Sequence, residues 1–209
     1  MRIGFDLGNV LCASDTEFLT KGDLTAAQRI PGGFETVAAA VAQNGPESNW
    51  IVSACGPRVQ GFSGKWLRQE GFFTLTGFHE SCFALPRRFE LDKVAASLRE
   101  NHVLFCEKRP HKAIIAAVLG LEAFVDDRIQ VLQELPDCVR LRIAFRPKAE
   151  ELAKLDDDRI VVVQDWLEVR ELLELTVWQC PVSIKRGGVY LYIHKTLPYY
   201  PAFLLSCRI

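Results

Sequence analysis

Several features that would assign this chain to a specialised class of protein are missing. No run of about 18 apolar residues occurs, so the sequence predicts no membrane-spanning helix. The formal net charge is only −1, which gives no electrostatic reason to expect nucleic acid or an anionic membrane as a partner. The first strand pattern follows Met1 at once, without the longer apolar stretch of a signal peptide. These absences favour a globular protein of the cytoplasm.

The seven cysteines form no recognisable framework. Their number is odd, their spacing is wide, and no C-x-x-C pair occurs. A disulfide scaffold or a zinc knuckle is therefore not expected, and a reducing cytosol suits the chain better. We expect each cysteine to be a small, buried hydrophobic side chain.

The order of the predicted elements indicates an α/β fold. The 209 residues, 49% of them hydrophobic, suit one domain or one domain with an appendage. Short apolar runs predict strands at 2–7, 50–54, 102–106, 122–126, 141–145 and 160–163. Helical patterns lie at 34–45, 58–70, 89–101, 110–118, 128–135, 147–155 and 165–175. This alternation predicts a mainly parallel sheet covered by helices on both faces.

Two stretches between these elements are less regular. Residues 14–30 are polar and irregular, which is typical of a loop or a small flap, and residues 71–82 are ambiguous. The segment between Asp6 and Ser53 is mostly used by the flap and one helix, and 54–107 adds only two helices and the ambiguous stretch. The sequence therefore leaves room for little or no cap domain.

The last 34 residues differ from the rest in composition. All four tyrosines lie in 176–209, whereas all 26 acidic residues lie before it. The extension carries four Lys or Arg, so residues 1–175 hold 21 basic and 26 acidic side chains, a net charge of −5. A hairpin around Gly187 and Gly188 is predicted within 184–195. The extension is either a partner-binding or dimerising appendage, or an incidental addition to a core of residues 1–175.

Polar side chains follow four of the predicted strands in a suggestive order. Asp6 ends the first strand, and Ser53 ends the second. Lys108 and Lys112 flank the start of the helix that follows the third strand, and the pair Asp126–Asp127 ends the fourth strand. Ligands of parallel sheets bind at the carboxyl ends of the strands, so these groups are expected to converge.

These residue types suit one kind of chemistry when they are brought together. Carboxylates are the usual protein ligands of Mg²⁺, a lysine neutralises a phosphate, and a serine hydroxyl holds a phosphoryl oxygen. Taken singly, each has a plainer explanation, because an Asp or Ser after a strand is commonly a turn residue or a helix cap. The joint order and spacing carry the functional interpretation.

The same residues resemble the motifs of the haloacid-dehalogenase-like (HAD) hydrolases. FDLGNVL (5–11) resembles the first motif of that family, with Asp6 at the nucleophile position. IVSACG (51–56) resembles the second motif, with Ser53, and EKRPHKAIIAAVLGLEAFVDDR (107–128) resembles the third and fourth together. The resemblance covers roughly residues 1–175. It implies a Rossmann-like three-layer sandwich and Mg²⁺-dependent phosphoryl transfer through an aspartyl-phosphate on Asp6.

The resemblance also implies a ligand set and a basic residue. The metal would be held by the Asp6 carboxylate, the main-chain carbonyl of Gly8, and Asp126 or Asp127. Lys108 fits the family's usual distance to the fourth-motif acid slightly better, whereas Lys112 fits an R-x-x-K pattern of members with FVDDR. We prefer Lys112 and keep Lys108 as the alternative.

Gly8 is the main departure from the family pattern. Phosphatases of the family usually carry a second Asp two residues after the nucleophile, as the general acid/base. Loss of a general acid typically removes about 10²–10⁴-fold in rate. The predicted function is therefore a Mg²⁺-dependent phosphatase acting on a phosphorylated substrate, and the alternative is a catalytically weak binding or regulatory protein on the same fold.

Other classes fit less well. A phosphoacceptor receiver domain has its acidic pair on the first strand, whereas this pair comes late. The sequence contains neither the G-x-G-x-x-G of dinucleotide enzymes after the first strand nor a phosphate-binding G-x-x-x-x-G-K-[ST] loop. A metal-free dehalogenase also lacks the second Asp, but Asp126 and Asp127 favour a cation.

By analogy with the family, a nearly capless site takes larger substrates or borrows a lid from a partner subunit.

Overall fold

The elements of the chain alternate between strand and helix, as the apolar pattern predicts. The computed structural model describes residues 1–175 and two further strands at 182–186 and 189–193. By their internal contacts the residues form two units, Met1–Leu175 and Thr176–Ile209. Each unit is described by itself.

One sheet organises the first unit. Its strands are β1 (Ile3–Phe5), β4 (Asn49–Ala54), β5 (Cys82–Ala84), β6 (Val103–Cys106), β7 (Ala123–Asp126), β8 (Leu141–Phe145) and β9 (Ile160–Val163). They pair in the order β5-β6-β4-β1-β7-β8-β9, and every pair is parallel. The predicted α/β fold with a parallel sheet is confirmed.

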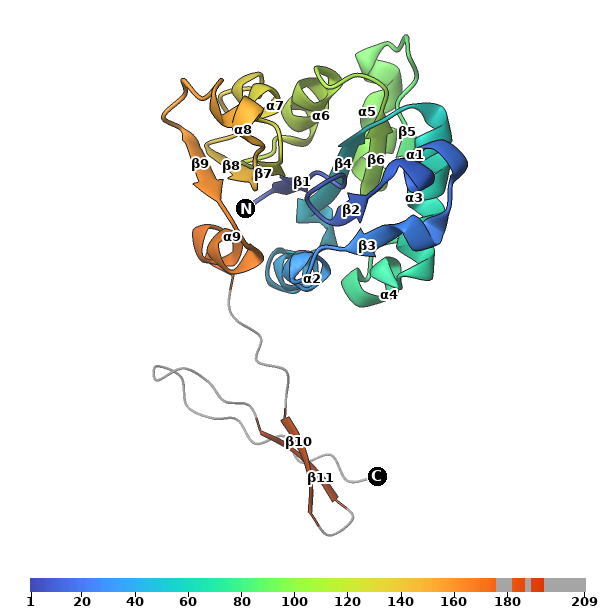
Figure 1. Cartoon of the computed structure of the whole chain (residues 1–209), viewed down its shortest axis with the longest axis vertical. Coiled ribbons are helices and arrows are strands. Elements are labelled where there is room, and N and C mark those ends of the chain that lie inside the picture. Colours follow the sequence, from blue (N-terminus) through green and yellow to red (C-terminus); the bar gives the residue numbers. More distant parts are fainter. Residues whose placement is uncertain (176–181, 187–188, 194–209) are drawn as a thin grey trace. The chain divides into compact units, whose positions relative to one another are not determined.

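Helices cover both faces of this sheet and make the fold a Rossmann-like three-layer sandwich (Figure 1). They are α1 (Thr16–Lys21), α2 (Gly33–Asn44), α3 (Pro57–Gln69), α4 (Phe72–Thr76), α5 (Leu91–Glu100), α6 (His111–Leu119), α7 (Ile129–Gln133), α8 (Ala149–Leu152) and α9 (Trp166–Leu172). Short 3-10 turns lie at Leu24–Ala26 and Pro46–Ser48.

Alternate residues of the buried strands supply two separate cores. Phe5, Ile51 and Val125 pack with side chains of α2, α3, α4 and α9 on one face. Trp50 and Phe124 pack with side chains of α5, α6 and α7 on the other. Successive strand residues point to opposite faces, and both faces are covered, so these strands read as continuous apolar runs in the sequence.

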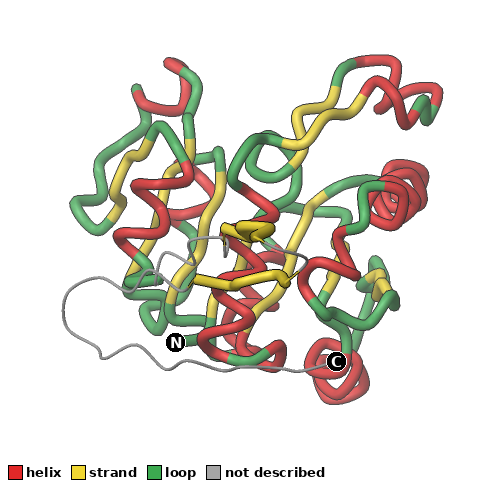
Figure 2. The backbone as a smooth tube through the Cα atoms, turned by 90° about the horizontal axis from the view of Figure 1, so that it is seen from below, coloured by secondary structure: helices red, strands yellow, loops and turns green. Residues whose placement is uncertain are grey.

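The stretch at 14–30 is an ordered flap. Strands β2 (Cys12–Ser14) and β3 (Ala27–Arg29) pair in antiparallel fashion, with α1 between them. The Asp15 side chain caps α1 by accepting hydrogen bonds from two main-chain N–H groups, and Gly22 ends the helix at φ 75°. Figure 2 shows the hairpin extending from the body of the unit, with a helical segment at its far end. The insertion is small, as predicted.

Other details differ from the sequence-based predictions. The ambiguous stretch 71–82 contains α4 and the start of β5, an edge strand of three residues that was too short to give a pattern. The five cysteines of the described residues are all free thiols. Cys12 and Cys106 are buried as expected, whereas Cys55 and Cys82 are only half-buried, and Cys138 is exposed because it lies on the surface turn between α7 and β8. Cys180 and Cys207 lie outside the described residues.

The second unit is described only by its hairpin. Strands β10 (Val182–Arg186) and β11 (Val189–Ile193) pair in antiparallel fashion, with Arg186 opposite Val189. This agrees with the hairpin expected in 184–195, although Gly187 and Gly188 themselves lie outside the described residues. Within the part of the chain that the structure describes, no helix combines the length and the apolar character needed to cross a membrane.

A buried arginine on β8 fixes the turn after α7. Arg142 is fully buried and donates to the main-chain carbonyls of Leu132 at 3.0 Å, Leu135 at 2.8 Å and Val139 at 3.1 Å. Its guanidinium also lies 3.2 Å from the Asp157 carboxylate. The side chain therefore satisfies carbonyls that the end of α7 leaves without helical partners.

We predict that Arg142→Met destabilises the fold. The methionine fills a similar space but leaves buried carbonyls unpaired, so the free energy of unfolding should fall by about 3 kcal/mol. The melting temperature should then drop by roughly 6–12 °C. Arg140→Met at an exposed position on the same segment is the matched control and should melt like the parent. Equal melting temperatures for the two variants would contradict this role of Arg142.

Candidate active site and metal centre

The predicted residues meet where the strand order of the sheet reverses. Strand β1 lies between β4 and β7, and the chain continues outward from it in both directions. Asp6 directly follows β1, and its main-chain N–H donates to the carbonyl of Val125 on β7 at 2.9 Å. Ser53 lies near the end of β4, and Asp126 ends β7. Such a switch point is where parallel α/β sheets bind ligands.

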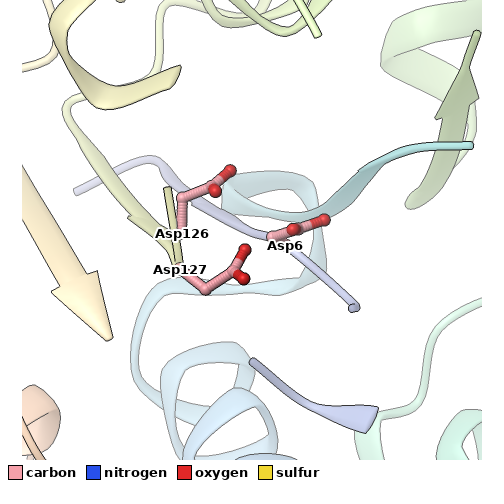
Figure 3. A group of neighbouring side chains, drawn as sticks. All are labelled: Asp6, Asp126 and Asp127. Carbon is pink, nitrogen blue, oxygen red and sulfur yellow. The ribbon is translucent and has the colours of Figure 1, made fainter. Parts of the chain in front are cut away.

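Three aspartates form a buried acidic cluster at this point. Each of Asp6, Asp126 and Asp127 offers one carboxylate oxygen, and these oxygens all lie within 4.8 Å of one another. The residues are 7%, 0% and 5% exposed, respectively. Figure 3 shows the three side chains gathered from the ends of two neighbouring strands. Carboxylate oxygens are the ligands that Mg²⁺ prefers, so the residues present fit a divalent cation.

Lys112 provides the positive charge of the cluster. Its ammonium nitrogen lies 2.9 Å from Asp6 Oδ1 and 2.7 Å from Asp126 Oδ2, and the side chain is 2% exposed. Lys112 belongs to the buried stripe of α6 with Ile115 and Leu119, a spacing that points one helix face at the sheet. Lys108 is exposed and lines a neighbouring pocket instead. Of the two candidate lysines, the structure brings Lys112 to the carboxylates.

The protein occupies some carboxylate oxygens of the cluster and leaves others open. Both oxygens of Asp126 are used, one by Lys112 and the other by the Arg128 N–H at 3.0 Å. Asp6 Oδ1 accepts from the Leu7 N–H at 2.8 Å, and Asp127 Oδ2 accepts from Asn9. Within residues 1–175, Asp6 Oδ2 and Asp127 Oδ1 accept no hydrogen bond. These two oxygens are the ones available to a metal or a substrate.

Asn9 is a site residue that the sequence analysis did not identify. Its side-chain amide donates to Asp127 Oδ2 at 2.9 Å, so it links the loop after β1 to the end of β7. Its backbone has φ 58°, a left-handed conformation that Asn tolerates better than most residues. The Gly8–Asn9 pair indicates a break in the strand pattern, but nothing in the sequence shows which side chain the amide contacts.

The protonation of the cluster reflects burial and crowded charge. Burial raises the pKa of Asp126 to about 7 against the opposing effect of Lys112, and the Asp6 carboxylate adds to the rise. Burial also raises the pKa of Asp127, with a further contribution from Asp6. Burial by itself lowers the pKa of Lys112, but Asp126 and Asp6 outweigh it, so this pKa lies above its ordinary value. Three carboxylates with one ammonium leave an excess of negative charge.

A pocket of about 420 Å³ lies over the cluster. Asp6, Ser53, Lys112 and Asp127 line it, and Ser53 is buried at its wall. The flap contributes Leu19 to the same pocket. The volume is within the usual range for small-molecule sites and exceeds what one phosphoryl group needs.

Gly8 also lines this pocket, where the resemblance predicts a second Asp in most phosphatases. A Cβ at Gly8 would meet no atom within 4 Å, and its φ is not positive. The absence of a side chain is therefore not imposed by crowding or by backbone conformation. Within the described residues, the Gly8 carbonyl also receives no main-chain hydrogen bond, so it is available as a metal ligand.

Comparisons with family models, with curated proteins and with solved structures gave no match to this chain.

We predict that Mg²⁺ stabilises the chain and that the effect grows with pH. Because Asp126 has a raised pKa in the metal-free fold, that fold binds a proton more tightly than the unfolded chain does. The metal-free melting temperature should therefore fall as the pH rises through about 7. Mg²⁺ should offset this fall by binding the deprotonated cluster. Thermal melts between about pH 6 and pH 8, with and without millimolar Mg²⁺, measure both effects.

Asp126→Asn is the control for that experiment. The amide cannot ionise, so the fall in the metal-free melting temperature near neutral pH should be much smaller in this variant. If calorimetry detects no binding of Mg²⁺ or Mn²⁺ to the parent protein at millimolar concentration, the cluster is not a metal site.

Proposed function

We propose that this chain is a Mg²⁺-dependent phosphohydrolase in which Asp6 is the nucleophile. The observation that carries the proposal is the buried cluster itself: two carboxylates with open oxygens lie beside a paired lysine, at the floor of a pocket at the switch point of the sheet. The resemblance of FDLGNVL and FVDDR to HAD-like hydrolase motifs supports the same chemistry. The five free cysteines are consistent with a reducing compartment such as the cytoplasm.

Asp6 has the arrangement that a carboxylate nucleophile requires. Oδ1 is held by Lys112 and by the Leu7 N–H, which fixes the orientation of the group. Oδ2 has no protein donor in the described residues and is free to attack phosphorus, which would break the P–O bond to the leaving group, release that group as an alkoxide or aryloxide, and leave an aspartyl-phosphate. Water would then attack this intermediate, release inorganic phosphate and regenerate the Asp6 carboxylate.

The other residues have distinct proposed roles. Lys112 neutralises charge that develops on the transferred group, because its ammonium is already positioned beside Asp6. Ser53 supplies a hydroxyl to a phosphoryl oxygen from the carboxyl end of β4, which lies on the other side of β1 from β7. Asp127 Oδ1 and the Gly8 carbonyl would hold Mg²⁺ beside Asp6, whose one open oxygen serves the attack, and Asp126 would position Lys112. When bound, the ion would draw negative charge from the phosphoryl oxygens.

We predict that Asp6→Asn abolishes turnover without loss of the fold. The amide matches the carboxylate in size but is a far weaker nucleophile, so kcat for an aryl phosphate should fall by at least about 10³-fold. Asp127→Asn should raise the Mg²⁺ concentration needed for half-maximal rate, because one ligand charge is lost. Lys112→Met should lower kcat without rescue by added Mg²⁺, whereas Lys108→Met should stay near the parent rate. Wild-type turnover by Asp6→Asn would exclude the aspartyl-phosphate mechanism.

The alternative function is a weakly catalytic binding or regulatory protein on the same fold, and Gly8 is the observation that favours it. Without an acid at this position, departure of an alkoxide is unassisted, so substrates with good leaving groups are favoured. Metal-dependent hydrolysis of an aryl phosphate by the parent protein would separate the two functions. A protein that binds Mg²⁺ and phosphate without measurable turnover would support the alternative.

We predict that Gly8→Asp increases hydrolysis of alkyl phosphates. Gly8 lines the pocket and a Cβ there would meet no atom within 4 Å, and the added carboxyl group would protonate an alkoxide leaving group. The gain should reach about 10-fold or more for an alkyl phosphate and remain near unity for 4-nitrophenyl phosphate, whose leaving group needs no proton. Gly8→Asn has the same shape without the acid and is the matched control. An equal gain in both variants would show that general-acid catalysis is not the cause.

A further inference from the structure

Two cations at the site have no partner among the residues that the structure describes. Arg109, in the turn before α6, and Lys148, immediately before α8, are both exposed and both line the pocket over Asp6. In residues 1–175, neither side chain forms an ion pair or a hydrogen bond. Arg128 of the same pocket differs, because its guanidinium lies 3.7 Å from the Glu151 carboxylate.

The chemistry proposed above does not use these two cations. Lys112 and a bound Mg²⁺ carry three positive charges, which balance the three carboxylates of Asp6, Asp126 and Asp127. This surplus of positive charge at the pocket contrasts with the net charge of residues 1–175, which is −5. Unpaired positive charge at the mouth of a pocket attracts an anion and raises its local concentration.

A second pocket adjoins the pocket over Asp6. Arg109, Ala54 and Val131 line both the pocket over Asp6 and an adjoining pocket of about 350 Å³. Lys108 lines the adjoining pocket as well, and its side chain has no ion pair among the described residues. A ligand with its phosphoryl group at Asp6 thus has room to extend toward Arg109.

We propose that the substrate carries a carboxylate on its leaving portion as a second anionic group, and that Arg109 and Lys148 bind it. This inference rests on the proposed function, because it places the phosphoryl group at Asp6. The exposed Leu19 of the flap and Val59 of α3 line the same pocket and supply apolar surface for the carbon chain between the two anions. The substrate class is therefore a short organic phosphate with two separated anionic groups.

Binding of non-hydrolysable analogues tests this inference independently of turnover. In titration calorimetry with saturating Mg²⁺, propylphosphonate is compared with 3-phosphonopropanoate, and pentylphosphonate with 5-phosphonopentanoate. Within each pair, a terminal methyl group is replaced by a carboxylate. We expect the carboxylate analogue of at least one pair to bind about tenfold more tightly, because a charged hydrogen bond is added.

Substitutions test whether Arg109 and Lys148 cause the preference for the carboxylate analogues. Arg109→Gln and Lys148→Gln should each remove most of it while leaving the affinity for the alkylphosphonates within about twofold. Arg140→Gln and Lys65→Gln make the same charge change at exposed positions that do not line the pocket, and should retain the preference.

The possible results separate the two proposals. If the alkylphosphonates bind and neither carboxylate analogue binds more tightly, the second anion site is wrong and the proposed function stands. If the preference survives in Arg109→Gln and Lys148→Gln as it does in the controls, these residues do not form the site. If no phosphonate binds at all in the presence of Mg²⁺, the phosphoryl site itself is absent and both proposals fail.

Discussion

The contact on which the site depends is the buried ammonium of Lys112 between the carboxylates of Asp6 and Asp126. Removing three charged groups from water is costly, and such a pair contributes little net stability to a fold. Its contribution is to fix the positions of the groups that it joins. One helix and two strand ends are tied together at a single nitrogen, and one oxygen of Asp6 is fixed while the other stays open. The same tie orients Asp126 away from solvent, which leaves Asp127 as the more accessible acid.

The charge balance of this arrangement explains why a cation suits it. One ammonium cannot neutralise three carboxylates, so the buried cluster resists full ionisation, and the pKa of Asp126 rises to about 7. A divalent ion with oxygen ligands resolves this conflict at neutral pH. In the proposed mechanism, Mg²⁺, Lys112 and Asp6 would therefore form one electrostatic unit, in which each makes the ionised state of the others less costly.

The residues around the acidic cluster bear on which substrates the proposed reaction would accept. Gly8 leaves open space where the general acid of a phosphatase would stand, so the proposed mechanism would favour leaving groups that depart without a proton. The flap, with Leu19, and the cations Arg109 and Lys148 line one pocket. With the proposed phosphoryl position at Asp6, the apolar surface and the surplus positive charge of this pocket would suit a small, doubly anionic substrate better than an alkyl phosphate with a neutral leaving group.

The sequence by itself determined the parallel α/β sheet, because strands buried on both faces must be apolar throughout and helices must separate parallel neighbours. It also determined that Asp6, Ser53 and the Asp126–Asp127 pair lie at strand ends. Tertiary structure decided which groups touch. Lys112, rather than Lys108, reaches Asp6 because packing of Ile115 and Leu119 sets the rotation of α6. Asn9 reaches Asp127, and the three-residue β5 pairs with β6, through contacts between segments distant in the chain. A local pattern contains no information on such contacts, because they depend on how elements pack around a shared core.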